Sequence, residues 1–181
     1  MEGIKHGISE TAAPVVVVSQ ELLPKLIKVL PSVPNVQTII VMEEPWNGML
    51  DLSELASIQA TVYTFNNIVK MGEKSQLIPT SPTKDDAAII MYTSGSTGVP
   101  KGVVQTHENL TSAMISVANY WGPVNDGFKS QEQTFIAFLP LAHVFEFLVE
   151  NVCMFFGIGI GYSTPNTLLG KIKNIMNYNT N

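Results

Sequence analysis

The sequence predicts an α/β fold, in which a sheet rich in parallel strands is flanked by helices. Short apolar runs alternate along the chain with segments of helical pattern, which is typical of parallel strands joined by helices. Hydrophobic residues make up 45% of the 181 positions and the mean hydropathy is +0.20, enough for the buried core of one domain. Strands are expected at 14–18, 36–42, 61–65, 87–91, 134–139 and 158–162. Helices are expected at 20–30, 66–71, 108–120 and 143–156.

The first half of the chain has clear strand and loop signals. Val15–Val18 is a β-branched run that indicates a buried strand, and Ser19 is placed to cap the helix that follows it. Residues 43–51 contain Pro, Trp, Asn and Gly and are expected to form a loop. Residues 72–86 are polar and contain prolines, so they are expected to be an exposed connection.

The second half places a distinctive loop between a strand and a helix. The apolar run at 87–91 indicates a buried strand. Thr106 is placed to cap the helix at 108–120, and Trp-Gly-Pro at 121–123 is expected to end that helix. Between strand and cap, residues 92–103 have the sequence Tyr-Thr-Ser-Gly-Ser-Thr-Gly-Val-Pro-Lys-Gly-Val.

This loop carries the groups that bind phosphate. Its glycines let backbone N–H groups turn toward an anion, its hydroxyls donate hydrogen bonds, and one hydroxyl can ligate a hard cation such as magnesium. Lys101 adds a mobile positive charge. The pattern is not G-x-x-x-x-G-K-[ST], because Pro100 and Gly102 stand where the P-loop has Gly and Ser or Thr. The residues expected to bind phosphate are Thr93, Ser94, Gly95, Ser96, Thr97, Gly98 and Lys101.

Two further blocks accompany the loop. Residues 138–146 are Phe-Leu-Pro-Leu-Ala-His-Val-Phe-Glu, and residues 157–165 are Gly-Ile-Gly-Ile-Gly-Tyr-Ser-Thr-Pro. With the loop at 92–103, they resemble the long-chain fatty acyl-CoA synthetases of the adenylate-forming, AMP-binding superfamily. The resemblance implies that residues 1–168 are an incomplete part of the N-terminal AMP-binding domain of such an enzyme, and that residues 169–181 form a divergent tail.

The resemblance also implies an activity, its cofactors and its partners. Such enzymes join a long-chain fatty acid to coenzyme A with ATP and Mg²⁺, through an acyl-adenylate and with release of pyrophosphate and AMP. It implies that Lys101 and the loop hydroxyls contact the β- and γ-phosphates, and that His143 lies beside the acyl pocket and the reacting carboxylate. The later motifs of the family, which supply an acidic magnesium ligand, a ribose-binding aspartate and a catalytic lysine, do not occur. This chain alone is therefore expected to be inactive.

Several polar and aromatic residues have more ordinary interpretations. Taken alone, His143 would be a structural residue at the start of a helix. Glu146 and Glu150 are expected to be solvated or ion-paired, and no metal site is expected because no second histidine is near. Cys153 is expected to be a buried thiol, not a nucleophile. Core packing is the favoured interpretation for Phe145, Phe147, Phe155 and Phe156.

Composition argues against several partners. The net charge of −5 disfavours nucleic-acid binding, and all ten basic residues are lysine, so no arginine is present to clamp a phosphate. Neither a signal peptide nor an apolar stretch long enough to cross a bilayer is found. The resemblance implies a membrane-associated parent enzyme at the endoplasmic reticulum or mitochondrial outer membrane, facing the cytosol, whereas this chain alone is expected to be cytosolic.

Two alternatives to a ligase fragment remain open. A catalytically inert truncated isoform or gene-model fragment would keep the same loop and would have at most an interaction role. An unrelated α/β phosphate-binding protein such as a kinase is disfavoured, because no kinase motif is present.

Overall fold

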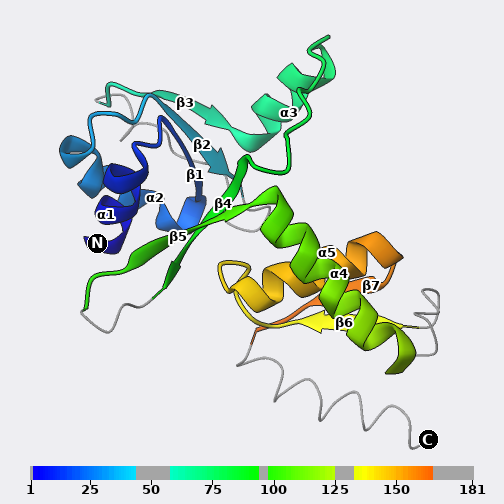
Figure 1. Ribbon diagram of the computed structural model, residues 1–181. Helices are drawn as coiled ribbons and strands as arrows, with labels where there is room; N and C mark the ends of the chain where they lie inside the picture. Colours follow the sequence, from blue (N-terminus) through cyan, green and yellow to red (C-terminus); the bar gives the residue numbers. More distant parts are fainter. Residues whose placement is uncertain (1, 44–57, 94–97, 125–132, 165–181) are drawn as a thin grey trace, which may run out of the picture. The chain divides into compact units, whose positions relative to one another are not determined.

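The computed structural model describes residues 2–43, 58–93, 98–124 and 133–164 (Figure 1). The chain forms two compact units, Met1–Thr80 and Ser81–Asn181. Each unit combines strands and helices, and each is described by itself below.

The first unit is built on a three-stranded parallel sheet. Its order is β1-β2-β3, and the register pairs Val16 with Ile39 and Ile39 with Val62. The elements in chain order are α1 (Glu2–Thr11), β1 (Val15–Ser19), α2 (Leu23–Val29), β2 (Thr38–Met42), β3 (Thr61–Thr64) and α3 (Phe65–Glu73). The helix expected at 20–30 is α2 with a 3₁₀ turn at each end, Gln20–Leu22 and Leu30–Ser32. The parallel strands expected here are confirmed, whereas α1 was not expected.

The core of this unit lies between one face of the sheet and the helices α1 and α2. Leu26 of α2 packs with Ile39 and Val41 of β2, and all three side chains are almost completely buried. The first strand is less buried than predicted. Val16 and Val18 pack against the core, whereas the alternate valines of β1 are exposed. Successive side chains of a strand point to opposite faces, so covering one face buries every second valine.

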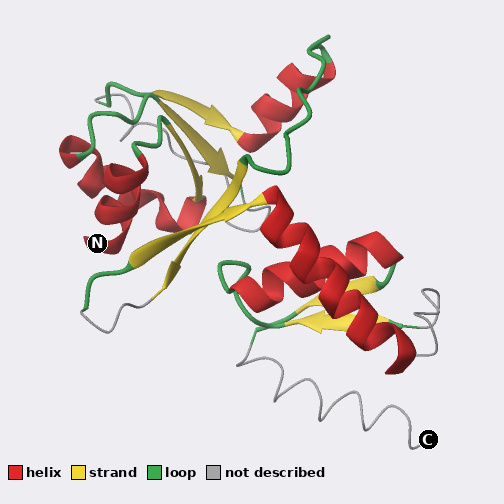
Figure 2. Ribbon diagram, in the orientation of Figure 1, coloured by secondary structure: helices red, strands yellow, loops and turns green. Residues whose placement is uncertain are grey.

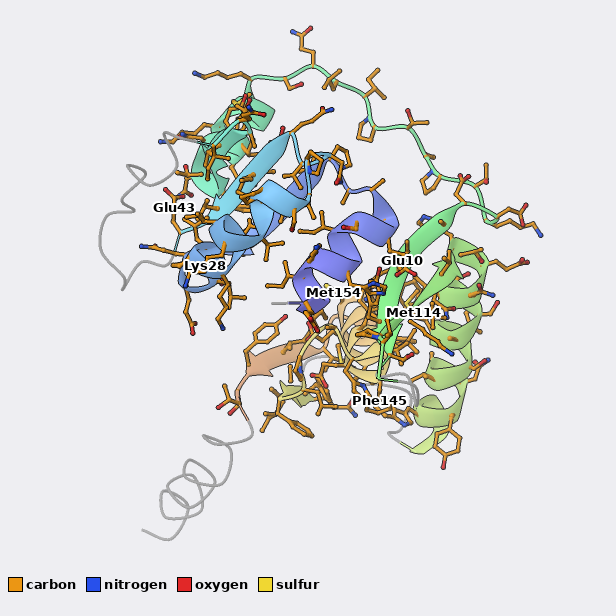
Figure 3. The ribbon with its side chains drawn as sticks, turned by 90° about the vertical axis from the view of Figure 1, so that its left-hand side faces the viewer. Glu10, Lys28, Glu43, Met114, Phe145 and Met154 are labelled. Carbon is orange, nitrogen blue, oxygen red and sulfur yellow. The ribbon has the colours of Figure 1, made fainter. Side chains whose placement is uncertain are left out.

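Two helix starts in this unit differ in how they are capped. Ser19 has the extended backbone of an N-cap, but its side chain makes no capping hydrogen bond, so the predicted cap is wrong. Thr64 does cap α3, because its Oγ1 accepts a hydrogen bond from the backbone N–H of Asn67 at 3.2 Å. Glu43, labelled in Figure 3, accepts a further bond from the N–H of Asn66 at 3.2 Å.

The second unit contains two separate two-stranded sheets (Figure 2). Its elements are β4 (Ala87–Thr93), β5 (Lys101–Thr106), α4 (His107–Val124), β6 (Thr134–Ala137), α5 (Val144–Phe156) and β7 (Gly159–Tyr162). Strands β4 and β5 pair antiparallel, whereas β6 and β7 pair parallel with α5 as their crossover. Val149 and Cys153 of α5 form a buried cluster with Ile158, against which Phe135 of β6 and Ile160 of β7 pack.

Three expectations for this unit need correction. The sequence prediction has no strand after the loop, but Lys101–Thr106 is strand β5. Of the strand expected to be buried at 87–91, Met91 is buried and the other side chains are half-buried or exposed, because β4 has a single partner strand. The helix α4 continues to Val124, one residue past the proline that was expected to end it. No helix in the part of the chain described above is long and apolar enough to span a membrane.

The first unit should depend strongly on Leu26. This side chain is 1% exposed, whereas Leu22, in the turn before α2, is 40% exposed. Leu26→Ala should lower the free energy of unfolding by about 2–5 kcal/mol, because it leaves a cavity in a closed core. Leu22→Ala should cost about 0.5 kcal/mol. Urea denaturation of both variants checks this, and equal losses would contradict the assignment of Leu26 to the core.

Candidate functional site

The antiparallel pairing of β4 with β5 closes the neck of the predicted phosphate loop. The last residue of β4, Thr93, lies opposite Lys101, the first residue of β5, and the Thr93 hydroxyl donates to the Lys101 carbonyl at 3.5 Å. Ser94, Gly95, Ser96 and Thr97 lie outside the described residues. Gly98 has φ +83°, a left-handed conformation that glycine adopts without strain, and no atom lies within 4 Å of where a Cβ would stand.

The side chain of Lys101 is exposed at this neck. Within the described residues it takes part in no ion pair. Thr93 and Gly98 are also exposed, so the three described members of the predicted site are open to solvent.

The other end of the hairpin is held by a reciprocal cap at the start of α4. The N–H of Asn109 donates to Thr106 Oγ1 at 3.2 Å, and the N–H of Thr106 donates to Asn109 Oδ1 at 3.1 Å. The predicted cap at Thr106 is therefore confirmed, with asparagine in the position that glutamate takes in a capping box. The N–H of His107 also donates to the carbonyl of Asp86 at 3.1 Å, which ties the start of α4 to the residue before β4.

His143 is the N-cap of α5. Its ring Nδ1 accepts a hydrogen bond from the backbone N–H of Phe145 at 3.3 Å, and the backbone N–H of His143 donates to the carbonyl of Pro140 at 2.8 Å. Because Nδ1 accepts, the neutral ring carries its proton on Nε2. The ring is exposed, so this Nε2–H is a donor available to a ligand. His143 lies in the connection from β6 to α5, and β6 belongs to a different sheet from the β4–β5 hairpin. The crevice that His143 and the phosphate loop were expected to share stays a prediction.

The two glutamates of α5 are buried, which overturns the prediction of a solvated face. Glu146 is 0% exposed and Glu150 is 5% exposed. The hydroxyl of Tyr162 in β7 donates to Glu150 Oε2 at 2.8 Å. Neither carboxylate oxygen of Glu146 has a hydrogen-bond partner in the described structure. The sequence carries only a weak signal for this burial, namely that the two glutamates are the only charged residues among the thirteen of α5.

These carboxylates change the acidity of their neighbours. The pKa of Tyr162 is raised, first because its phenol donates to Glu150 and then through desolvation and the charges of both glutamates. Burial raises the pKa of the Cys153 thiol, and the charges of Glu150 and Glu146 add to this effect. The prediction that Cys153 is a buried, unreactive thiol is supported by this environment.

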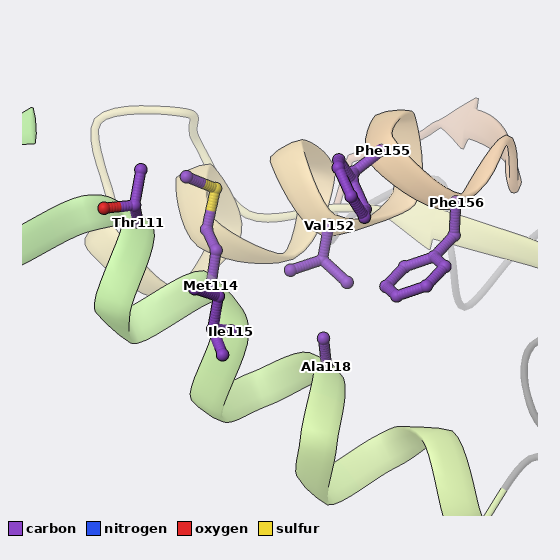
Figure 4. Close-up of a pocket in the computed structure, with 7 residues that line it drawn as sticks. All are labelled: Thr111, Met114, Ile115, Ala118, Val152, Phe155 and Phe156. Atoms are coloured by element: carbon purple, nitrogen blue, oxygen red, sulfur yellow. The ribbon is translucent and has the colours of Figure 1, made fainter. Parts of the chain in front are cut away.

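An apolar groove lies between α4 and α5. Figure 4 shows Ala118 of α4 and Val152 of α5 pointing toward one another across it. The cavity holds about 260 Å³ and is lined by Thr111, Met114, Ile115, Ala118, Val152, Phe155 and Phe156. Phe155 is 84% exposed and stands edge-on to Phe156, with ring centroids 5.2 Å apart. Core packing is therefore wrong for Phe155, and also for Phe145, which is 47% exposed and is labelled in Figure 3.

The sequence profile of a known family covers almost the whole chain. The profile described as AMP-binding enzyme matches residues 1–180. The chain belongs to the AMP-binding enzyme family. This membership rules out the alternative of an unrelated phosphate-binding protein such as a kinase.

Relatives within this family point to long-chain acyl-CoA ligases, as the sequence blocks predicted. Long-chain-fatty-acid–CoA ligase 2 of Schizosaccharomyces pombe is 32% identical over 167 residues, which cover 92% of this chain and 24% of the relative. Long chain acyl-CoA synthetase 8 of Arabidopsis thaliana is 35% identical over 169 residues, which cover 92% of this chain and 22% of the relative. The chain thus spans about a quarter of the length of the curated relatives it matches.

Solved structures support the fold class. The A-PCP didomain of carboxylic acid reductase from Segniliparus rugosus, in complex with AMP, matches with a TM-score of 0.64 at 22% identity, over 89% of this chain and 23% of that one. ATP-bound MatB from Rhodopseudomonas palustris matches with a TM-score of 0.57 at 20% identity, over 88% and 27%. The predicted α/β fold of an adenylate-forming N-terminal domain is confirmed at the level of the fold.

The Glu150–Tyr162 hydrogen bond predicts a measurable change in acidity. In Glu150→Gln, the pKa of Tyr162 should fall toward its ordinary value, because ionisation no longer places two negative charges side by side. Glu73→Gln, a change at the end of α3, is the matched control and should leave Tyr162 unchanged. Ultraviolet titration of tyrosinate, with Tyr162→Phe to assign the signal, measures both. An unaltered titration in Glu150→Gln would show that the bond is not formed.

Proposed function

We propose that this chain supplies the ATP-phosphate-binding part of a long-chain fatty acid–CoA ligase. The reaction would convert a long-chain fatty acid, ATP and coenzyme A to acyl-CoA, AMP and pyrophosphate through an acyl-adenylate. The observation that carries the proposal is the glycine- and hydroxyl-rich loop closed by Thr93 and Lys101, in a chain whose relatives are named as long-chain acyl-CoA ligases.

The donor set fits a pyrophosphate leaving group. When a fatty carboxylate attacks the α-phosphorus, the bond to the departing pyrophosphate breaks and charge grows on its oxygens. Hydroxyls and backbone N–H groups of the loop, with the ammonium of Lys101, would stabilise that charge and hold the leaving group in line. The proposed binding residues are Thr93, Ser94, Gly95, Ser96, Thr97, Gly98 and Lys101. No protein nucleophile is needed, which agrees with a buried Cys153.

His143 is proposed to act on the acyl side of the reaction. The cap at Phe145 keeps Nδ1 as an acceptor, so Nε2–H is the group available to donate to an oxygen of the fatty carboxylate or the acyl-adenylate. A donor held by a helix cap keeps its direction without reorganisation, which is the property that transition-state stabilisation requires.

Mg²⁺ and coenzyme A enter the proposal through the family. Among the described residues, no three His, Cys, Asp or Glu side chains gather as a metal site would need, so no residue is assigned to Mg²⁺. We likewise assign none of the described residues to the binding of coenzyme A. From the family resemblance we also propose that the whole enzyme acts at the endoplasmic reticulum or the mitochondrial outer membrane, facing the cytosol. We propose that residues 1–168 are part of its AMP-binding domain and that residues 169–181 diverge from the long-chain acyl-CoA synthetases, within a family profile that extends to residue 180.

Lys101 should be required for binding of the phosphates. Lys101→Ala should weaken ATP or pyrophosphate binding by roughly 10- to 150-fold, because a charge-assisted hydrogen bond contributes about 1.5–3 kcal/mol. Lys74→Ala, another exposed lysine, is the control and should bind like the wild type. Calorimetry on the chain tests binding, and fatty-acid-dependent pyrophosphate release by the complete enzyme tests the reaction. Equal affinities of the wild type and Lys101→Ala would refute the assignment.

A pair of substitutions separates the chemical role of His143 from its role as a cap. Asparagine is a good N-cap but lacks the Nε2–H, whereas alanine lacks both. His143→Asn and His143→Ala should each lower kcat by about 100-fold in the complete enzyme. Thermal or urea denaturation should show a loss of about 0.5–2 kcal/mol for His143→Ala and little for His143→Asn. Full activity in His143→Asn would mean that the residue only caps α5.

A further inference from the structure

The segment after α3 is an open, irregular stretch of chain. Residues 75–83 have no helix or strand, and every side chain in this range is exposed. Leu77 and Ile78 are 89% and 90% exposed. The boundary between the two compact units falls inside this segment, between Thr80 and Ser81. An extended and accessible peptide is what a modifying enzyme needs to seat in its own cleft.

This segment contains a hydroxyl residue in a specific setting. Ser81 is followed by Pro82 and, three residues on, by Lys84. Proline has no backbone N–H. A modifying enzyme with an apolar pocket for the residue after the serine therefore accepts proline, whereas any other residue would bury an unpaired backbone N–H in that pocket. The lysine can pair with an acidic group on the same enzyme. One other hydroxyl–proline pair exists in the chain, Thr164-Pro165, and it has no cation three residues on.

Local contacts favour the hydroxyl of Ser81 over that of Thr83 as the group that is modified. Thr83 is engaged in a turn, because its hydroxyl donates to Asp86 Oδ2 at 3.0 Å and its N–H donates to the same oxygen at 2.6 Å. Lys84 pairs with Glu108 at 3.2 Å, but the two side chains are 68% and 53% exposed. Such a solvent-screened pair contributes little, so Lys84 can leave it to meet a partner.

We propose that Ser81 is a phosphorylation site for a proline-directed serine/threonine kinase. In this step the Ser81 oxygen forms a bond to the γ-phosphorus of ATP, and the bond from that phosphorus to the β–γ bridging oxygen breaks. ADP leaves with the electron pair, and the hydroxyl proton passes to the base of the kinase. The inference rests on the exposed segment and on the sequence and contacts of residues 81–84, and it is independent of the ligase activity.

The added charge acts on the start of α4. A phosphoserine carries about −1.5 to −2 charges at neutral pH, and Lys84 is the cation nearest to it along the chain. Lys84 therefore turns from Glu108 to the phosphate. The backbone bond from the N–H of Glu108 to the Lys84 carbonyl, 2.9 Å, keeps this turn attached to α4. The modification thus rearranges the side chains where β5 passes into α4.

The test uses the full chain with a purified cyclin-dependent kinase, ATP and Mg²⁺, followed by peptide mapping by mass spectrometry. Phosphate should appear on Ser81, and Ser81→Ala should abolish it. Pro82→Ala and Lys84→Ala should each reduce the initial rate by roughly tenfold or more. Thr83→Ala and Thr164→Ala are matched controls that should leave the rate unchanged. A kinase directed to basic sites should not modify Ser81.

Two results would overturn the proposal. One is phosphate on Thr164 or Thr83 in place of Ser81. The other is no incorporation into the wild-type chain while a standard peptide substrate is phosphorylated in the same tube. If Lys84→Ala is phosphorylated at the same initial rate as the wild type, then Lys84 is not recognised by the kinase, and this part of the proposal is wrong.

Discussion

The antiparallel pairing of β4 with β5 is the constraint on which the proposed phosphate site depends. It holds Thr93 and Lys101 opposite one another, so both ends of the loop between them are fixed. The reciprocal cap of Thr106 and Asn109 fixes the far end of β5. A loop anchored at both ends loses less entropy when it closes on a ligand. This anchoring would favour the proposed binding of pyrophosphate.

A second constraint is the burial of α5. Its apolar sides pack into the cluster around Val149 and Cys153, which fixes the direction in which the helix start presents His143. The same packing buries the side chains of Glu146 and Glu150. Glu150 is compensated by the hydroxyl of Tyr162, whereas Glu146 has no such bond within the described part of the chain. An uncompensated buried carboxylate costs stability, so α5 combines a well-packed core with a locally unfavourable group.

The elements that sequence patterns predicted well are those whose signal is local. The valines of β1, the threonine at position 106 and the histidine that starts α5 each depend on neighbours within a few residues. The main errors concern pairing and burial, although the local signal for a cap at Ser19 was also wrong and α1 was not expected. Strand β5 was not predicted, because the glycine-rich loop before it was interpreted only as a phosphate-binding loop. Two β-prone runs on either side of a glycine-rich loop are also the pattern of a hairpin, which is how β4 and β5 pair. The solvated face assigned to Glu146 was wrong because a charge on a helix does not reveal what packs against it.

The absence of arginine ties these features together. In the proposed phosphate site, anion recognition would rely on lysine, hydroxyls and backbone N–H groups, because the chain has no arginine. Lysine is a flexible point charge and does not impose the planar, two-bonded geometry of a guanidinium. Geometry must therefore come from the backbone, which makes the anchored hairpin more important than it would be beside an arginine clamp. The left-handed Gly98 would serve the same purpose in the proposed site, because glycine adopts this conformation without strain and no atom lies within 4 Å of where a Cβ would stand.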